Sequence, residues 1–125
     1  MPTTPITVLA LQSIGATTPN LGLKVLRTVA DVTNQNQFAW TGREILLAFN
    51  TGATSHNVSI QSASLGGRAV ANVSAPIAAL GDSLGGDVLA WYDFRFGSSW
   101  VKTGSIVEFG ADNAEVRFAI VRLPF

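Results

Sequence analysis

The segment WTGREILLAFNTGATSHNVSIQS, residues 40–62, predicts two β-strands joined by a turn. The first strand, near residues 43–50, is apolar on both faces, which is typical of a central strand that is covered on both sides. In the second strand, near residues 56–62, apolar and polar residues alternate. Val58 and Ile60 share one face while polar residues occupy the other, as in a half-buried strand. This hairpin predicts a β-protein, and it offers few groups that could carry out chemistry.

The remainder of the chain also has the turn signals of a β-protein. Gly-rich turns recur at short intervals, and regular turns of this kind favour a sandwich or barrel over helices joined by loops. The best helix candidate, residues 73–84, contains Pro76, which allows at most a short helical turn. We expect an all-β, single-domain antiparallel β-sandwich, jelly-roll-like, with about eight strands. The candidate strands lie near residues 6–12, 22–30, 43–50, 56–62, 68–80, 87–96, 104–110 and 114–123.

Composition limits the classes of function. The chain has 125 residues, the size of one domain, and 47% of them are hydrophobic while only 13% are charged. So low a charge content indicates that much of the exterior contacts other protein, and we expect self-association. Lysine plus arginine and aspartate plus glutamate number 8 each. This balance lacks the basic surplus of nucleic-acid-binding proteins and of segments recruited to anionic membranes, so we expect neither partner.

The N-terminal segment MPTTPITVLALQSIG has no basic region before its apolar residues, and its apolar run is short and interrupted. It therefore predicts neither a signal peptide nor a membrane span, and we expect the protein to be made in the cytoplasm. We divide the chain into residues 1–14, which form an N-terminal arm or the first strand of the sandwich, and residues 15–125, which form the β-sandwich domain. Both interpretations of the first segment stay open.

No residues form a catalytic or metal-binding pattern. The chain has no cysteine, and its single histidine, His56, follows a turn and lacks a second histidine or a cysteine to complete a metal site. We interpret His56 as a surface turn residue. The acids lie mostly in or beside turns, where short carboxylates accept hydrogen bonds from backbone N–H groups. We therefore expect no enzyme activity, no catalytic residues, no cofactor and no metal.

The segment DVLAWYDFRFGSSW, residues 87–100, concentrates the aromatic residues of the second half. Strand alternation divides it into two faces. The face predicted to point into the core carries Val88, Ala90, Tyr92, Phe94 and Phe96. The opposite face is a candidate interface, because Trp and Arg are enriched where interfaces concentrate binding energy. The interface candidates are Leu89, Trp91, Asp93, Arg95 and Trp100.

Two alternatives remain open for this second face. Trp91 could lie beneath a neighbouring loop, with Asp93 and Arg95 forming an ordinary ion pair on the same face. Exposed aromatic rings also stack against sugars, although the segment lacks the cluster of Asn and acidic side chains that would bind sugar hydroxyls.

Several segments together resemble one family. The strand GREILLAFN, the turn NTGATS, the strand HNVSIQSA and the last strand EVRFAIVRL resemble those of the small jelly-roll head decoration, or cement, proteins of tailed bacteriophages. An aromatic-rich segment precedes the last strand, as it does in that family. The resemblance spans roughly residues 20–123. The chain differs in carrying AWYDFRF where such proteins more often have a Pro-rich turn.

The resemblance implies a non-enzymatic structural protein of a phage virion, made in the host cytoplasm. Such a protein would bind the outer surface of the capsid shell and stabilise the shell by bridging neighbouring subunits of the major capsid protein, and a homotrimer is the implied oligomer. Residues 1–14 would supply apolar contacts with the capsid. These capsid-contact candidates are Ile6, Val8, Leu9, Leu11 and Ile14. The alternative is a tail-associated receptor- or glycan-binding β-sandwich module, which would share the fold.

Overall fold

The computed structural model describes residues 3–10, 27–62, 73–79, 88–92, 94, 100–102 and 105–123, and in these ranges the chain forms ten strands and no helix. The strands are β1 (Thr4–Pro5), β2 (Val8–Ala10), β3 (Thr28–Val29), β4 (Asn36–Ala39), β5 (Glu44–Asn50), β6 (His56–Ile60), β7 (Val73–Ile77), β8 (Leu89–Trp91), β9 (Ile106–Ala111) and β10 (Val116–Arg122).

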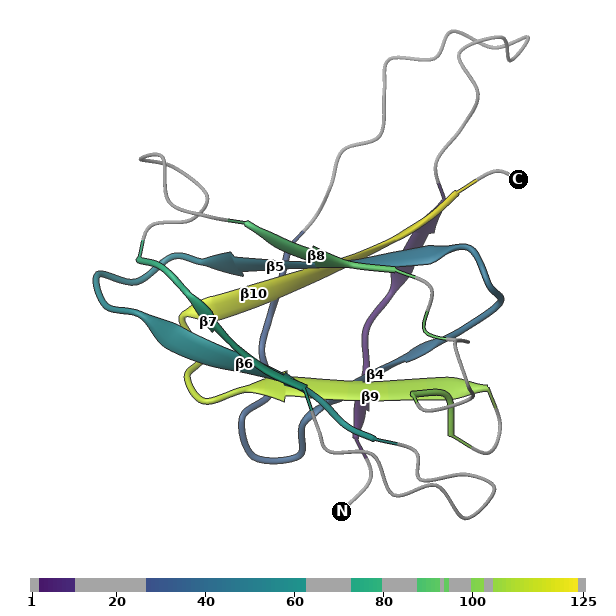
Figure 1. Cartoon of the computed structure of the whole chain (residues 1–125), viewed down its shortest axis with the longest axis horizontal. Helices are drawn as coiled ribbons and strands as arrows, with labels where there is room; N and C mark the ends of the chain where they lie inside the picture. The colour runs from purple at the N-terminus through teal and green to yellow at the C-terminus, as the bar shows by residue number, and fades with distance from the viewer. Residues whose placement is uncertain are drawn as a thin grey trace, which may run out of the picture.

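The strands form two sheets that pack face to face (Figure 1). Sheet A has the order β1-β4-β9-β6-β7, and sheet B has the order β2-β10-β5-β8, with β3 also paired to β10. Among themselves, the eight strands β3 to β10 pair only in the antiparallel sense, and they lie in the order of a jelly roll. The predicted single-domain β-sandwich is therefore confirmed.

Both sheets are mixed, because the N-terminal segment adds one parallel strand to each. β1 pairs in parallel with β4 of sheet A, and β2 pairs in parallel with β10 of sheet B. We call residues 3–10 the N-terminal strap, since they cross from one sheet to the other. The strap is attached to the sandwich by two backbone hydrogen bonds of 2.9 Å. The Thr4 amide donates to the Gln35 carbonyl, and the Ile6 amide donates to the Gln37 carbonyl.

Two of the strands, β1 and β4, lie outside the eight predicted segments, and β4 lies between β1 and β9 in sheet A. Its sequence NQFA has a single large apolar side chain, Phe38, which is 1% exposed. The other inward position is Asn36, whose Oδ1 accepts a hydrogen bond from the Asp31 amide at 3.1 Å. A strand that buries a polar residue in this way has no alternating apolar pattern to reveal it. The helical turn considered near Pro76 is instead the edge strand β7, where a missing N–H is tolerated.

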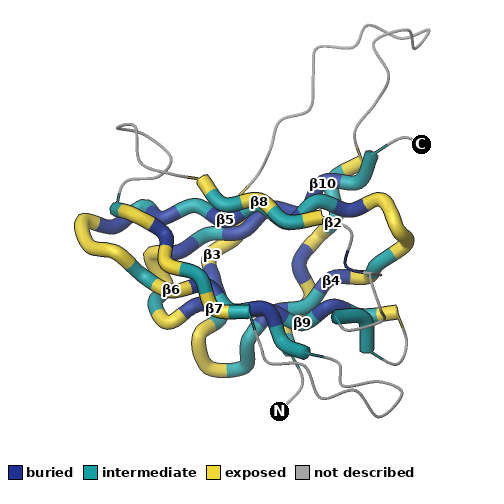
Figure 2. Tube along the Cα trace, viewed as in Figure 1, coloured by how far each residue is buried: buried dark blue, intermediate teal, exposed yellow. Residues whose placement is uncertain are grey.

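The core lies between the two sheets, where the inward faces are buried (Figure 2). A chain of aromatic contacts crosses it. Phe38 meets Phe94 edge to face at 5.5 Å and Phe109 at 5.8 Å, and Phe109 meets Phe118 of the opposite sheet at 4.7 Å. Such edge-to-face pairs add to the stabilisation that burial alone provides. The predicted inward residues of the opening hairpin, Val58 and Ile60, are 0% and 2% exposed.

One end of the β5–β10 pairing is held by an ion pair whose carboxylate is buried. Glu44 and Arg122 are directly opposite in the register, and Arg122 Nε lies 2.5 Å from Glu44 Oε2. The Glu44 side chain is fully buried, and it also accepts hydrogen bonds from the amide and hydroxyl of Thr41, both at 2.6 Å. Burial favours the neutral acid, but the Thr41 hydrogen bonds and the Arg122 charge outweigh it and lower the pKa of Glu44.

The turn between β5 and β6 adjoins the other end of this pairing. Asn50 is fully buried, and its Nδ2 donates to the carbonyls of Thr54 at 2.8 Å and Ile77 at 3.1 Å. Its Oδ1 accepts from the Gly52 amide at 2.9 Å. One side chain therefore closes the turn and ties it to strand β7 of the other sheet.

The buried amide of Asn50 gives the first prediction. We expect Asn50→Ala to lower the free energy of unfolding by about 2–3 kcal/mol, because the substitution removes three hydrogen bonds of a buried side chain. The Ile77 carbonyl would keep only the longer bond from the Ser55 hydroxyl, at 3.3 Å. Asn57→Ala, an exposed position on β6, is the matched control and should change stability by no more than about 0.5 kcal/mol. Urea unfolding measures both. An Asn50→Ala variant as stable as its control would mean that the turn does not depend on this side chain.

The lowered pKa of Glu44 predicts a specific pH dependence. A carboxylate whose pKa is lower in the folded chain stabilises the fold above its ordinary pKa, and this contribution is lost as the pH falls through the lowered value. Between about pH 6 and about pH 3, the wild type should therefore lose more unfolding free energy than Glu44→Gln. Asp31 and Glu108, whose pKa values are also lowered, titrate in both proteins and cancel in the difference. Urea unfolding at the two pH values measures these losses. If the wild type and Glu44→Gln lost equal unfolding free energy, this assignment would be contradicted.

Candidate functional site

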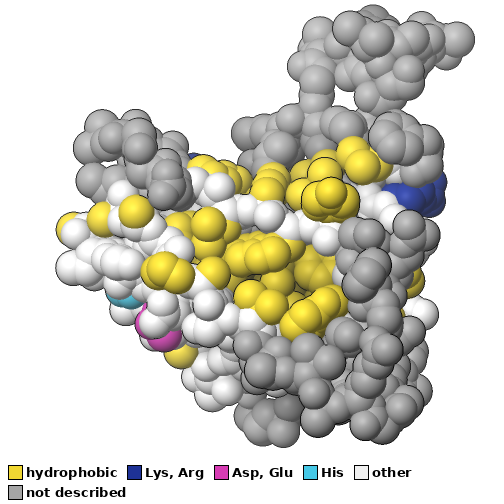
Figure 3. Space-filling view, in the orientation of Figure 1, with side chains coloured by type: hydrophobic (Ala, Val, Ile, Leu, Met, Phe, Trp, Pro, Cys, Tyr) yellow, Lys and Arg dark blue, Asp and Glu magenta, His cyan; other side chains and the backbone are white. Residues whose placement is uncertain are grey.

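The two sheets end side by side at the edge strands β7 and β8. An apolar hollow of about 90 Å³ opens between these edges. Figure 3 shows it as a recess among hydrophobic side chains near the centre of the visible face. We call it the aromatic hollow, and its lining residues are Ile60, Val73, Trp91, Tyr92, Phe94 and Trp100.

The register of β8 against β5 decides which aromatic residues point inward. Trp91 lies opposite Leu46, and Leu89 lies opposite Ala48. Leu46 and Ala48 are both 0% exposed on the core face. Because directly opposite residues share a face of the sheet, Trp91 and Leu89 also face the core, against which they pack while partly buried.

The predicted face assignment of this segment was wrong for the strand itself. Tyr92 and Val88, expected in the core, are 78% and 44% exposed, and Ala90 is also exposed. The inward residues of β8 are instead Leu89 and Trp91, two of the interface candidates. The alternation does not continue past the strand, because Phe94, in the turn that follows, is 3% exposed as predicted.

The structure places the other candidate residues as follows. Trp100 is partly buried against the core and lines the aromatic hollow. Ile6 was predicted as a capsid contact, but its side chain is 5% exposed and belongs to the core, so it offers no contact surface in this fold. Val8 packs partly buried against the same core, and Leu9 is half-buried. Leu11, Ile14, Asp93, Arg95 and Phe96 lie outside the described residues.

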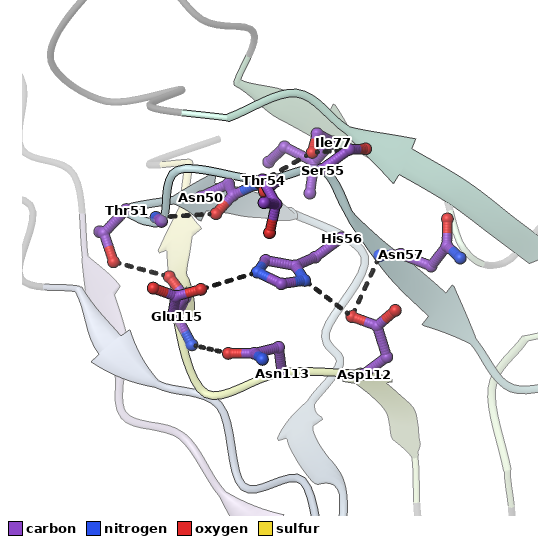
Figure 4. A network of polar contacts seen from close by, with 11 residues as sticks. Asn50, Thr51, Thr54, Ser55, His56, Asn57, Ile77, Asp112, Asn113 and Glu115 are labelled. Carbon is purple, nitrogen blue, oxygen red and sulfur yellow. Dashed lines mark hydrogen bonds and ion pairs between the residues drawn. The ribbon is translucent and has the colours of Figure 1, made fainter.

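A polar cluster at the end of the sandwich was not found by sequence reasoning. The side chain of His56, interpreted as a surface turn residue, is only 11% exposed and lies between two carboxylates (Figure 4). Its Nε2 is 2.9 Å from Glu115 Oε1, and its Nδ1 is 3.5 Å from Asp112 Oδ1. The cluster ties the start of β6 to the β9–β10 turn. Across the described residues, no three acidic, histidine or cysteine side chains are placed to hold a metal ion.

Of the clusters described, the aromatic hollow has the features of a recognition site. Its lining is apolar except for the tyrosine hydroxyl and the indole N–H groups, so it suits an apolar side chain of a partner better than a charged group. Tyr92 stands at its rim as a large exposed aromatic residue. Tyr and Trp are the residues that most often anchor protein interfaces.

Comparisons with known proteins found no matching family model, no matching curated protein and no matching solved structure. In the part of the chain that the structure describes, there is no helix long and apolar enough to cross a membrane.

The adjacent residues Trp91 and Tyr92 should respond differently to truncation. We expect Trp91→Ala to lower the free energy of unfolding by about 2–4 kcal/mol, because it removes a large side chain packed against the core. Tyr92→Ala should change it by no more than about 0.5 kcal/mol, because that ring is mostly in solvent. Chemical unfolding followed by circular dichroism compares the two variants. Equal losses would show that Tyr92 is also part of the core.

Proposed function

We propose that the chain is a non-enzymatic structural protein of a phage virion. It binds the outer surface of the capsid shell, self-associates as a trimer and bridges neighbouring subunits of the major capsid protein. The observation that carries the proposal is the aromatic hollow with exposed Tyr92 at its rim. The resemblance of the hairpin and of the last strand to head decoration proteins supplies the class of partner.

The chemistry of the hollow favours a protein surface as its ligand. Its apolar lining gains free energy from removing apolar area from water. Trp91 and Trp100 are held in place by packing against the core, so they lose little freedom on binding. A rigid apolar recess with an exposed aromatic at its rim is the arrangement of an interface anchor.

The titratable clusters described above have structural roles under this proposal. The His56, Asp112 and Glu115 cluster joins a strand to a turn, and Glu44 with Arg122 holds the register of two strands. Neither cluster lines the aromatic hollow. We therefore assign the chain no catalytic residue and no cofactor.

Bridging explains how a small protein stabilises a large shell. A shell under internal pressure fails when neighbouring subunits separate, so a stabilising protein must hold at least two of them together. A trimer presents three copies of the aromatic hollow. After one has bound, the others act at an effective concentration near millimolar, and the combined affinity exceeds that of a single site by about a hundredfold or more.

Sedimentation with capsids tests this function. Wild-type protein should sediment with expanded capsids of the phage and remain in solution with unexpanded procapsids, in which the neighbouring subunits are differently spaced. Tyr92→Ala should weaken binding to expanded capsids by about 30-fold, the equivalent of about 2 kcal/mol for an interface anchor. Val32→Ala, which truncates an exposed apolar residue on the β3–β4 turn, is the control and should bind as wild type does.

A tail-associated glycan-binding module is the second candidate, and the exposed ring of Tyr92 beside Trp91 and Trp100 favours it. Sugars stack on such rings, but a sugar site also needs polar groups for the hydroxyls. Binding to a glycan array, lost in Tyr92→Ala and accompanied by no binding to capsids, would establish the second candidate and reject the first.

A further inference from the structure

The N-terminal strap is bound to the sandwich by a small set of contacts. Ile6 contributes the one fully buried apolar side chain of the described strap. The Thr4 hydroxyl donates to Asp31 Oδ2, and the Thr3 hydroxyl donates to the Gln37 side-chain oxygen, both at 2.5 Å. With the two backbone bonds to Gln35 and Gln37, these contacts define a docking surface along the edges of β4 and β10.

No tight turn joins the strap to the strands with which it pairs. Both of its pairings are parallel, and parallel neighbours cannot be linked by a hairpin. The strap is therefore a separate piece of chain that occupies two sheet edges, and the same edges would accept an identical segment from any other copy.

The chain between the strap and the sandwich is much longer than the gap that it must cross. Ala10 lies opposite Arg122 and Thr28 lies opposite Phe118, on the same edge of β10. Four residues along a strand correspond to about 13 Å. Residues 11–27 join these two points, and a chain of that length can span about 55 Å. This excess allows the strap to reach the corresponding edges of a neighbouring molecule.

We propose that the N-terminal strap is exchanged between copies of this chain. In the assembled protein, residues 3–10 of one copy occupy the β4 and β10 edges of the next copy and bury Ile6 in its core. The contacts are the same as within one chain, so exchange forms no new interface and breaks none, and a closed ring leaves no docking surface empty. The inference concerns contacts between copies, and it holds whatever surface the assembled protein binds.

Disulfide trapping tests the exchange, because the natural chain has no cysteine. Pro5 and Gln37 are directly opposite in the β1–β4 register, at a strand spacing that a disulfide can bridge. We expect the oxidised double variant Pro5→Cys with Gln37→Cys to run mostly as covalent dimers and larger species on a denaturing gel without reductant. The control is Asn57→Cys with Pro76→Cys, opposite residues of the β6–β7 hairpin, which should form a disulfide within one chain and run as a monomer.

A second arm of the experiment removes any pairing within one chain. The single variants Pro5→Cys and Gln37→Cys are unfolded together, refolded as a mixture and oxidised. Exchange predicts a covalent heterodimer linked through positions 5 and 37, identified by peptide mass spectrometry. A double variant that runs as a crosslinked monomer, a mixture without the heterodimer, or the absence of any disulfide at these positions would overturn the proposal. Because this readout uses purified protein alone, it is independent of capsid binding.

Discussion

The antiparallel pairing of β5 with β10 is the constraint on which the rest of the structure depends. It runs without interruption from Glu44 opposite Arg122 to Asn50 opposite Val116. The outer edge of β10 holds β2 and β3, and the outer edge of β5 holds β8. A slip of one residue would turn every side chain of a strand to the opposite face. The Glu44–Arg122 ion pair at one end and the Thr51 hydrogen bonds to the Glu115 carbonyl at the other oppose such a slip, because both join the two sides of the pairing in this register.

The two open sides of the sandwich differ in what covers their sheet edges. On one side, the N-terminal strap covers the edges of β4 and β10 and places Ile6 between the sheets. On the other side, the edges of β7 and β8 leave the aromatic hollow. The position of Trp91 in that hollow follows from the register of β8 on β5, and so from the central pairing. We therefore assign a different role to each side: the strap side links copies of the chain, and the aromatic hollow binds the partner.

The sequence allowed the fold class to be predicted, because the information needed for it is local. Alternation at Val58 and Ile60 and the two apolar faces of residues 43–50 identify a half-buried strand and a central strand. Local patterns could not identify β4, because Asn36 is buried through its hydrogen bonding with the Asp31 backbone and not through an apolar side chain. The cluster around His56 could not be predicted from local patterns either, because its carboxylates come from the β9–β10 turn, far away in the sequence. In the segment around Trp91 and Tyr92, both alternating faces carry large aromatics, so only the register with β5 decides which ring is buried.

Native-state hydrogen exchange with increasing denaturant tests most directly the claim that the β5–β10 pairing is the framework and the strap a separable attachment. The account predicts that the amides of β5 and β10 exchange only through global unfolding, whereas those of Thr4 and Ile6, bonded to the carbonyls of Gln35 and Gln37, exchange through a smaller opening with a weaker dependence on denaturant. Strap amides as strongly protected as those of β10, or an opening of β5 from β10 that precedes release of the strap, would contradict it.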